Sequence, residues 1–185
     1  MRIVAGKFRG RQLLSPSDAK IRPTADRVRE SIFNILASRI GPRLDGLKVL
    51  DLFAGTGAMG LEALSRGAAQ VVFVDTGAES RGLIRDHIEA FGAGGVSKLL
   101  RRDATALGPA GTLGPFRLVF LDPPYGQGLG ERALGSLEEG GWLAPEATLV
   151  LEESAEAALE LPAGFVLDDR RQYGAAAVHF LGRNG

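Results

Sequence analysis

From residue 47 onward, short apolar runs that suit β-strands alternate with segments of helical periodicity. The expected strands are residues 47–53, 70–75, 98–103, 116–122 and 147–154, and the expected helices are residues 57–67, 78–92 and 129–139. Strands that are so short and so apolar are typical of parallel sheets buried on both faces. The alternation therefore predicts an α/β fold with a doubly wound, mostly parallel sheet and helices on both faces.

Two terminal segments lie outside this alternation. Residues 2–13 contain two short extended pieces around a glycine-bearing turn, which predicts a small β-hairpin. Thr24 is placed to cap a helix that runs to Ile40, with apolar residues at helical spacing. At the other end, residues 165–174 and 175–182 form two extended runs that predict a closing antiparallel hairpin.

Charge is distributed unevenly along the chain, although the formal net charge is zero. Residues 1–43 contain ten basic and three acidic residues, a balance of +7, and residues 44–185 contain twelve basic and nineteen acidic residues, a balance of −7. A basic segment on an acidic body predicts a docking surface for a polyanion, and a solvated, salt-bridged surface is the alternative. We therefore divide the chain into a basic extension over residues 1–43 and an α/β domain over residues 44–185.

Composition excludes several classes of protein. The chain has no cysteine, which rules out disulfides, thiolate metal sites and a cysteine nucleophile. No apolar run approaches the length of a membrane span, and the basic start MRIVAGKFRG does not resemble a signal peptide. We therefore expect a cytoplasmic protein with no membrane partner.

Four of the expected strands end in an acidic residue, namely Asp51, Asp75, Asp103 and Asp122. Ligands of open α/β sheets bind outside the carboxyl ends of the strands, at the point where the strand order reverses. A single aspartate there is as readily a turn or cap residue. Four in succession predict a ligand site at this edge of the sheet.

The turn after the first strand contains the pattern G-x-G-x-x-G at Gly55, Gly57 and Gly60, and Asp75 follows fifteen residues after Gly60. This pattern alone is typical of dinucleotide binding, with the acid on a ribose hydroxyl. However, the carboxylate of Asp51 lies in the approach to the turn and would repel a pyrophosphate. The same carboxylate favours a cationic nucleoside without phosphates, and S-adenosylmethionine is such a ligand.

S-adenosylmethionine brings ribose hydroxyls, an adenine amine and a positively charged amino-acid tail. We expect Asp51 to favour the charged tail, Asp75 to accept hydrogen bonds from the ribose hydroxyls, and Asp103 to accept one from the adenine amine. The predicted cofactor-binding residues follow the first three strands: Asp51, Phe53, Ala54, Gly55, Thr56, Gly57, Asp75, Thr76, Asp103 and Ala104.

The tetrad Asp122, Pro123, Pro124 and Tyr125 follows the fourth strand. Two prolines hold an extended turn and remove two backbone donors, which leaves the Asp122 carboxylate and the Pro123 carbonyl as acceptors beside an aromatic ring. This arrangement suits a planar group that carries an exocyclic amine, because the acceptors bind both N–H groups while Tyr125 stacks on the ring. We predict that these four residues form the catalytic turn.

The blocks DLFAGTGAMG, VFVD, RRDA and DPPY resemble successive motifs of S-adenosylmethionine-dependent amino-methyltransferases. Together with residues 2–13 and 22–36, they are similar to the bacterial family that methylates N2 of a guanine in small-subunit ribosomal RNA. Phe8 stands where the family is expected to have tryptophan. This resemblance implies a Rossmann-like class I methyltransferase fold with a small N-terminal extension and a C-terminal antiparallel hairpin.

The resemblance also implies a reaction. One methyl group passes by direct displacement from S-adenosylmethionine to N2 of a loop guanine in 16S ribosomal RNA, leaving S-adenosylhomocysteine, without a metal. The expected substrate is a partly assembled small subunit, and the expected oligomeric state is a monomer. The charge balance adds a set of expected RNA-binding residues in the extension: Lys7, Arg9, Arg11, Arg22, Arg27 and Arg29. For the last three, ion pairing with Asp26 or Glu30 is the alternative.

Three other functions are weighed against this one. A nicotinamide-dependent oxidoreductase explains the glycine pattern but neither the tetrad nor the basic extension. A catalytically silent RNA-binding module leaves Asp122 and Tyr125 without a role. A DNA adenine or a protein glutamine amide as acceptor keeps the chemistry, although the amide enzymes more often have asparagine at the first tetrad position.

Overall fold

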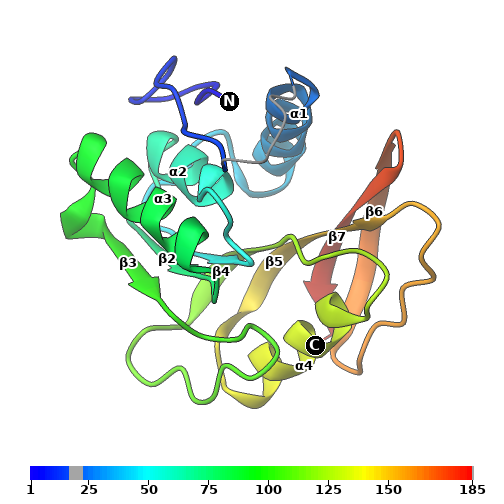
Figure 1. Ribbon diagram of the computed structural model, residues 1–185. Helices are drawn as coiled ribbons and strands as arrows, with labels where there is room; N and C mark the ends of the chain where they lie inside the picture. Colours follow the sequence, from blue (N-terminus) through cyan, green and yellow to red (C-terminus); the bar gives the residue numbers. More distant parts are fainter. Residues whose placement is uncertain (17–22, 185) are drawn as a thin grey trace.

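The computed structural model describes residues 1–16 and 23–184, and within these residues a seven-stranded sheet carries helices on both faces (Figure 1). The strands are β1 (Lys48–Leu52), β2 (Gln70–Val74), β3 (Ser97–Leu100), β4 (Phe116–Leu121), β5 (Leu143–Ser154), β6 (Phe165–Tyr173) and β7 (Ala176–Arg183). Their order in the sheet is β3-β2-β1-β4-β5-β7-β6. The first five strands are parallel, and β7 is antiparallel to both β5 and β6. This confirms the predicted parallel sheet and the closing hairpin.

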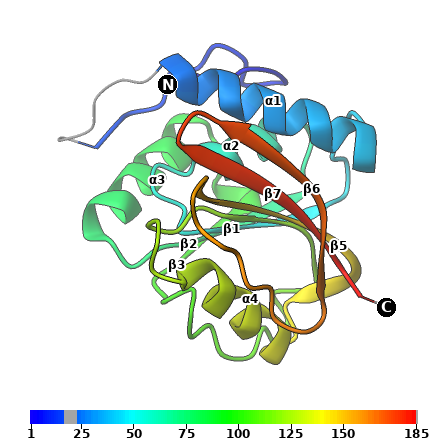
Figure 2. The same ribbon diagram turned by 90° about the vertical axis from the view of Figure 1, so that its right-hand side faces the viewer.

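The helices divide between the two faces of the sheet. They are α1 (Pro23–Ile40), α2 (Ala58–Ser65), α3 (Ala78–Ala90) and α4 (Leu129–Glu139), with a short 3-10 turn η1 (Gly94–Val96) before β3. The first three lie over one face, and α4 lies over the other (Figure 2). No helix in the part of the chain that the structure describes is both long and apolar enough to cross a membrane.

Each face of the sheet has its own hydrophobic core, because neighbouring residues of a strand point in opposite directions. In β1, Val49 packs with the helices α1 to α3, whereas the adjacent Leu50 packs on the α4 side with Trp142. All three side chains are fully buried. Burial of β1 and its parallel neighbours on both faces explains why their sequences are continuously apolar.

The sheet reverses direction beside β1. This strand pairs with β2 on one side and with β4 on the other, so the chain crosses over after β3. The carboxyl ends of β1 and β4 therefore face a crevice at which the strand order reverses, the usual ligand position in such sheets. Asp51 lies near the end of β1, and Asp122 follows β4 directly.

The N-terminal segment, residues 1–16, differs from the expected hairpin. It is a loop closed by one antiparallel bridge between Arg2 and Gln12, without two regular strands. Its backbone donors instead find partners on α2, because the Glu62 carboxylate accepts hydrogen bonds from the N–H groups of Val4 (2.9 Å) and Ala5 (3.1 Å). A partner strand is therefore not needed to satisfy these groups.

The expected helix of the extension begins two residues earlier than predicted, at Pro23 instead of Ala25. Its first residue is Pro23, so Thr24 lies inside the first turn and does not precede the helix. Proline is well suited to this position because its fixed φ matches the helix and its missing N–H group has no helical partner there. The buried side chains of Ile3, Leu13 and Leu36 join the core of the sheet, so the extension packs as part of the same folded unit.

Candidate active site

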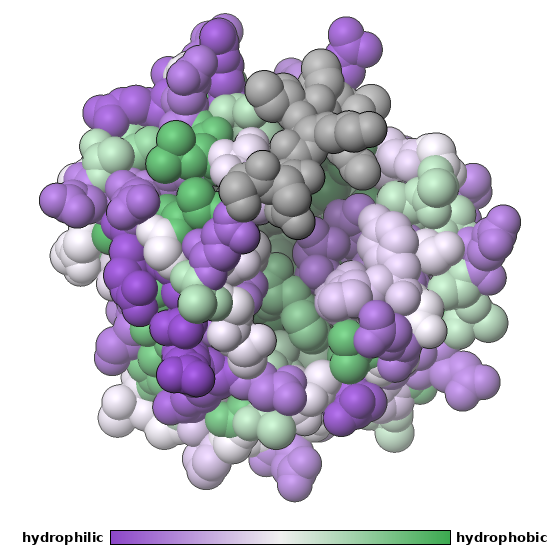
Figure 3. Space-filling model, viewed as in Figure 1, coloured by the Kyte–Doolittle hydropathy of each residue, from purple (hydrophilic) through white to green (hydrophobic). Residues whose placement is uncertain are grey.

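A cavity of about 870 Å³ opens at the carboxyl ends of β1 and β4. Figure 3 shows the hollow near the centre of the face that is seen in Figure 1. Its walls come from α1, the glycine-rich turn after β1, the ends of β4 and β5, and the turn between β6 and β7. The expected site residues on its walls are Asp51, Phe53, Ala54, Gly55, Thr56, Asp122, Tyr125, Arg27 and Arg29.

The glycine-rich turn connects β1 to α2 in a conformation that requires small residues. Gly57 has a φ of 81°, in the left-handed region. A Cβ atom on Gly60 would lie 2.4 Å from the Phe73 ring, so only glycine allows α2 to pack this closely on β2. Phe53 has a φ of 53°, which is unusual for an aromatic residue and is typical of functional turns. Its position on the cavity wall fits that pattern.

Asp51 is a buried carboxyl group on the wall of the cavity, 2% exposed. Its Oδ2 accepts a hydrogen bond from the N–H of Gly60 at 3.0 Å. Burial raises the pKa of Asp51 to about 8, against the opposing effect of this hydrogen bond. A cationic group in the cavity would stabilise the ionised form, so Asp51 is suited to bind a positively charged ligand.

Asp75 follows β2 directly and stabilises the glycine-rich turn through a hydrogen bond. Its Oδ2 accepts from the N–H of Gly55 at 2.9 Å, and its Oδ1 accepts from the N–H of Gly77 at 2.8 Å. Each oxygen retains a further lone pair that is able to accept a ligand hydroxyl. Asp75 and the exposed Thr76 lie next to the turn rather than on the cavity wall, and the same holds for Gly57.

The third predicted pair, Asp103 and Ala104, does not line the cavity. Asp103 is exposed, and its Oδ1 accepts hydrogen bonds from the backbone N–H (2.8 Å) and the hydroxyl (2.7 Å) of Thr105. These bonds lower the pKa of Asp103. Ala104 is buried in the core on the α4 side of the sheet. The structure therefore does not bring this pair together with Asp51 and Asp122.

The tetrad forms the turn that leaves β4 at the cavity. The Asp122 N–H donates to the carbonyl of Leu52 at 3.4 Å, which ties the turn to the end of β1. Pro123 is buried, Pro124 is exposed, and the Asp122 and Tyr125 side chains are open to the cavity. Asp122 is exposed to solvent in the open cavity, and partial desolvation by the cavity walls together with the charges of Glu152 and Asp51 raises its pKa above the usual range.

Two glutamates at the end of β5 belong to the site and were not predicted from the sequence. The Tyr125 hydroxyl donates to Glu152 Oε1 at 2.5 Å, and the N–H of Gly126 donates to Glu153 Oε1 at 2.9 Å. Burial and the Glu152 bond raise the pKa of Tyr125. The signal that could have revealed them is a pair of acids at the carboxyl end of an apolar strand, the same signal that located the four aspartates.

His87 of α3 connects the glycine-rich turn with the N-terminal segment. Its Nδ1 donates to the carbonyl of Thr56 at 2.9 Å, and its Nε2 accepts from the N–H of Leu14 at 2.8 Å. Both bonds require a neutral imidazole with the proton on Nδ1. Burial also lowers the pKa of His87, in agreement with the neutral form.

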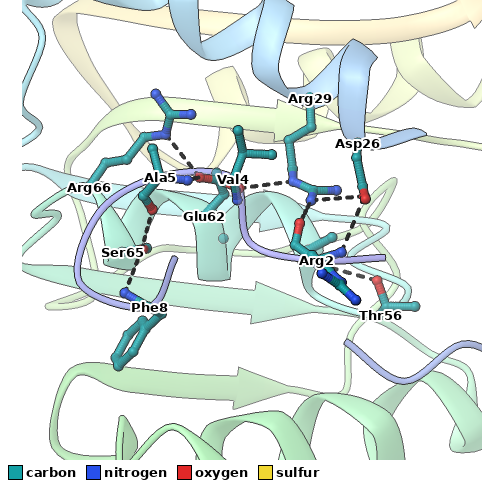
Figure 4. Close-up of polar contacts among 12 residues, drawn as sticks. Arg2, Val4, Ala5, Phe8, Asp26, Arg29, Thr56, Glu62, Ser65 and Arg66 are labelled. Atoms are coloured by element: carbon teal, nitrogen blue, oxygen red, sulfur yellow. Dashed lines mark hydrogen bonds and ion pairs between the residues drawn. The ribbon is translucent and has the colours of Figure 1, made fainter. Parts of the chain in front are cut away.

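The expected RNA-binding residues fall into two groups. Lys7, Arg9, Arg11 and Arg27 are exposed, whereas Arg29 is 3% exposed. The expectation for Arg29 requires correction, because its guanidinium group pairs with Glu62 and Asp26, both at 3.1 Å, and donates to the carbonyl of Arg2 (Figure 4). Such a buried and fully partnered cation is not available to an RNA phosphate. Arg22 lies outside the described residues.

The sheet order, the glycine-rich turn after β1 and the tetrad turn after β4 together define a methyltransferase with a Rossmann-like fold. The solved structure of precorrin-6y C5,15-methyltransferase from Geobacter metallireducens GS-15 shares this fold, with a TM-score of 0.64 at 15% identity over 94% of this chain and 95% of that chain. The chain belongs to the family described as Conserved hypothetical protein 95, whose model matches residues 1–182.

Two further comparisons cover nearly the whole chain. The protein named Ribosomal RNA small subunit methyltransferase D from Escherichia coli (strain K12) is 39% identical over 185 residues, which are 99% of this chain and 90% of that protein. The solved structure of yhhF from Escherichia coli has a TM-score of 0.83 and 34% identity, and the match covers 99% of this chain and 97% of that chain.

Proposed function

We propose that this protein transfers a methyl group from S-adenosylmethionine to the exocyclic N2 of a guanine in 16S ribosomal RNA, leaving S-adenosylhomocysteine. The observation that carries the proposal is the single cavity in which Asp122 and Tyr125 face the same space as Asp51 and the glycine-rich turn. A ribosomal RNA substrate is supported by the Escherichia coli relative, whose name includes the small ribosomal subunit and which aligns with 99% of this chain.

The residues of the cavity fit the chemistry of S-adenosylmethionine. This compound supplies an electrophilic methyl group on a sulfonium centre and carries a cationic amino-acid tail. The buried Asp51 carboxylate is suited to that positive charge, and Asp75 has lone pairs for the ribose hydroxyls. Asp103 and Thr76 stay proposed contacts to the adenosine part, although neither lines the cavity in this structure. Among residues 1–16 and 23–184 no cluster of three side chains suited to bind a metal is present.

The tetrad is suited to an aromatic amine as the acceptor. The lone pair of such a nitrogen is delocalised into the ring, so the enzyme must align it with the methyl group. The two N–H groups of the amine donate hydrogen bonds to the Asp122 carboxylate and the Pro123 carbonyl, and Tyr125 stacks on the base. Positive charge develops on the nitrogen during attack, and the Asp122 carboxylate stabilises it. A base in this position must leave its helical stack, which is least costly for a loop nucleotide.

The exposed tip of the N-terminal segment supplies the surface for the RNA backbone. Its two ends, Met1 and Pro16, line the cavity, and its turn carries the exposed cations Lys7, Arg9 and Arg11. The segment that carries these cations therefore reaches the cavity at both of its ends. A short basic segment recognises RNA shape more readily than sequence, so we propose that a preassembled part of the small subunit presents the target guanine to a monomeric cytoplasmic enzyme.

The proposal is tested by tritium transfer from labelled S-adenosylmethionine to small ribosomal subunits that lack the modification, with nucleoside analysis of the product. We expect the label in N2-methylguanosine. The comparison substrate is naked 16S ribosomal RNA, which we expect to be methylated less efficiently than the small subunit. Label in methyladenosine or in protein would show that the assigned acceptor is wrong, while the assignment as a methyltransferase would stand. We would then test DNA and protein substrates in that order.

Cofactor affinity is expected to rise with pH between about pH 6 and 7.5. Because the pKa of Asp51 is raised to about 8, the free protein holds a proton that a bound cation displaces. The folded protein without ligand therefore binds the extra proton, and the dissociation constant falls by up to about tenfold per pH unit over this range. Calorimetric titration in two buffers of different ionisation enthalpy measures the released proton. An Asp51→Asn variant with the same pH slope would contradict this assignment.

Replacing Lys7 and Arg9 with alanine is expected to weaken RNA binding and to lower its dependence on salt. Each lost phosphate contact reduces the slope of log affinity against log salt concentration by about 0.7 to 0.9. The matched control is Arg43→Ala, which removes an exposed arginine beyond the opposite end of α1 that pairs with Asp45 at 2.9 Å. Fluorescence anisotropy with a labelled RNA fragment measures both slopes. An unchanged slope in the double variant would place the RNA elsewhere.

A further inference from the structure

Glu152 lies beside Asp122 at the carboxyl edge of the sheet. Strands β4 and β5 are parallel neighbours, and such neighbours lie about 4.8 Å apart. Leu121 of β4 pairs with Leu151 of β5, and each leucine is followed by an acidic residue, Asp122 or Glu152. Both leucines pack in the core on the α4 side of the sheet. Because successive side chains of a strand point to opposite faces, the two acids face the α1 side, where both line the cavity.

The Tyr125 hydroxyl places the Glu152 carboxylate at the edge of the Tyr125 ring. It donates a hydrogen bond to Glu152 Oε1 at 2.5 Å. A carboxylate has about four lone-pair sites on its two oxygens, so this bond leaves room for a further donor. Val178, which lies opposite Glu152 in the pairing of β5 with β7, lines the same cavity. A base that stacks on Tyr125 therefore presents one of its edges to Glu152.

Three acidic residues of the described chain line the cavity, and the proposed function uses only two of them. Asp51 accepts from the N–H of Gly60 and is assigned to the cationic tail of the cofactor. Asp122 is assigned to the amine that receives the methyl group. Glu152 is the third acid, and no lysine or arginine within residues 1–16 and 23–184 forms an ion pair with it. Its carboxylate is therefore available to a ligand.

Guanine carries a second donor next to the amine that is methylated. Its ring nitrogen N1 bears a hydrogen, and N1–H and the N2 amine lie side by side on the Watson–Crick edge. With the amine at Asp122 and Pro123, N1–H requires its own acceptor, because a donor that loses water and gains no partner is costly. Adenine has the opposite pattern, since its N1 is an acceptor beside the N6 amine and would repel a carboxylate. Enzymes that act on an extruded base read it through this edge.

We propose that the Glu152 carboxylate accepts the hydrogen bond from N1–H of the target base and thereby selects guanine over adenine. The inference rests on the proposed function and assigns its base specificity to one residue of β5. Asp122 binds the amine of either base, whereas Glu152 distinguishes the ring atom next to that amine. Tyr125 contributes twice, because its ring stacks on the base and its hydroxyl orients the Glu152 carboxylate.

The test compares two target bases that carry the same 2-amine. In a fragment of 16S ribosomal RNA that the enzyme methylates, the target guanine is replaced with 2,6-diaminopurine, whose N1 is an acceptor. We expect the wild type to prefer guanine. In Glu152→Gln, the ratio of kcat/KM for guanine to that for 2,6-diaminopurine is expected to fall by about 10- to 10²-fold, the range for loss of one hydrogen bond to a charged group. Glutamine keeps the length of the side chain, and its amide is able to donate to the acceptor N1.

The ratio separates recognition of the base from folding, because a merely structural change lowers both rates equally. Glu152→Ala removes the carboxylate without adding a donor and is expected to lower the ratio as well. The matched control is Glu156→Gln, an exposed carboxylate just beyond the same strand, which should leave the ratio unchanged.

An unchanged ratio in either Glu152 variant would overturn the inference and would leave Asp122 as the acceptor of both N1–H and the amine. This outcome differs from failure of the proposed function. If the wild type methylates a nitrogen other than guanine N2, the proposed function is wrong and the inference fails with it. If the wild type methylates guanine N2 and the ratio does not change, only the role of Glu152 is wrong.

Discussion

Replacing Asp122 with alanine is expected to abolish methyl transfer and to leave cofactor affinity near that of the wild type. The variant loses the carboxylate that holds the amine and stabilises the charge on its nitrogen, and removal of one such group costs about 10²- to 10³-fold in kcat. Loss of orientation adds to this cost. Cofactor binding should persist because Asp51 and Asp75, the carboxylates assigned to the cofactor, remain. Single-turnover methyl transfer and calorimetric binding measure the two effects separately.

Two variants make this prediction specific. Asp122→Asn keeps one acceptor oxygen and should retain part of the activity, while Asp75→Ala should weaken cofactor binding because it removes the acceptor of the Gly55 and Gly77 N–H groups. If Asp122→Ala remains within tenfold of the wild-type rate, the assignment of Asp122 is wrong. If circular dichroism shows that either alanine variant is unfolded, the loss of activity or binding is due to unfolding, and the replaced side chain has a structural role.

Replacing Glu62 with alanine is expected to lower the free energy of unfolding by about 3–5 kcal/mol, the usual cost of breaking a buried ion pair from one side. Glu62 is fully buried, and its carboxylate binds Arg29 (3.1 Å), Arg66 (3.0 Å) and the backbone N–H groups of Val4 and Ala5. The variant would leave a buried guanidinium group and two donors without this partner. Urea unfolding measures the loss.

The N-terminal segment should respond first to this change. In hydrogen exchange, the amides of Val4 and Ala5 are expected to lose protection before those of the central strands. The matched control is Glu89→Gln, which changes an exposed glutamate on α3 and should shift stability by less than about 0.5 kcal/mol. A loss of less than 1 kcal/mol in Glu62→Ala would mean that the contacts in Figure 4 are not the anchor of the extension.

Local sequence patterns were sufficient to predict the sheet and to locate two turns that the structure places on the wall of one cavity. The strands and helices could be located because the spacing of apolar residues and the positions of turn residues are local features of the sequence. The turn at Gly55–Gly60 and the tetrad at Asp122–Tyr125 could be located for the same reason, because each is a continuous segment that follows a strand. Both turns line one cavity because parallel strands end at the same edge of a sheet.

Contacts between distant segments could not be predicted in this way. Arg29 was expected on the surface, but it pairs with Glu62, which lies 33 positions away, and it is buried. Glu152 reaches Tyr125 across 27 positions, and Asp103 turns toward its own neighbour Thr105 instead of the cavity. The sequence by itself determined most of the strands and helices of the α/β domain and the turns that follow β1 and β4, because those preferences are local. Only the tertiary structure decided which charges are paired, buried or open to the cavity, because that depends on how the packed elements satisfy one another's polar groups.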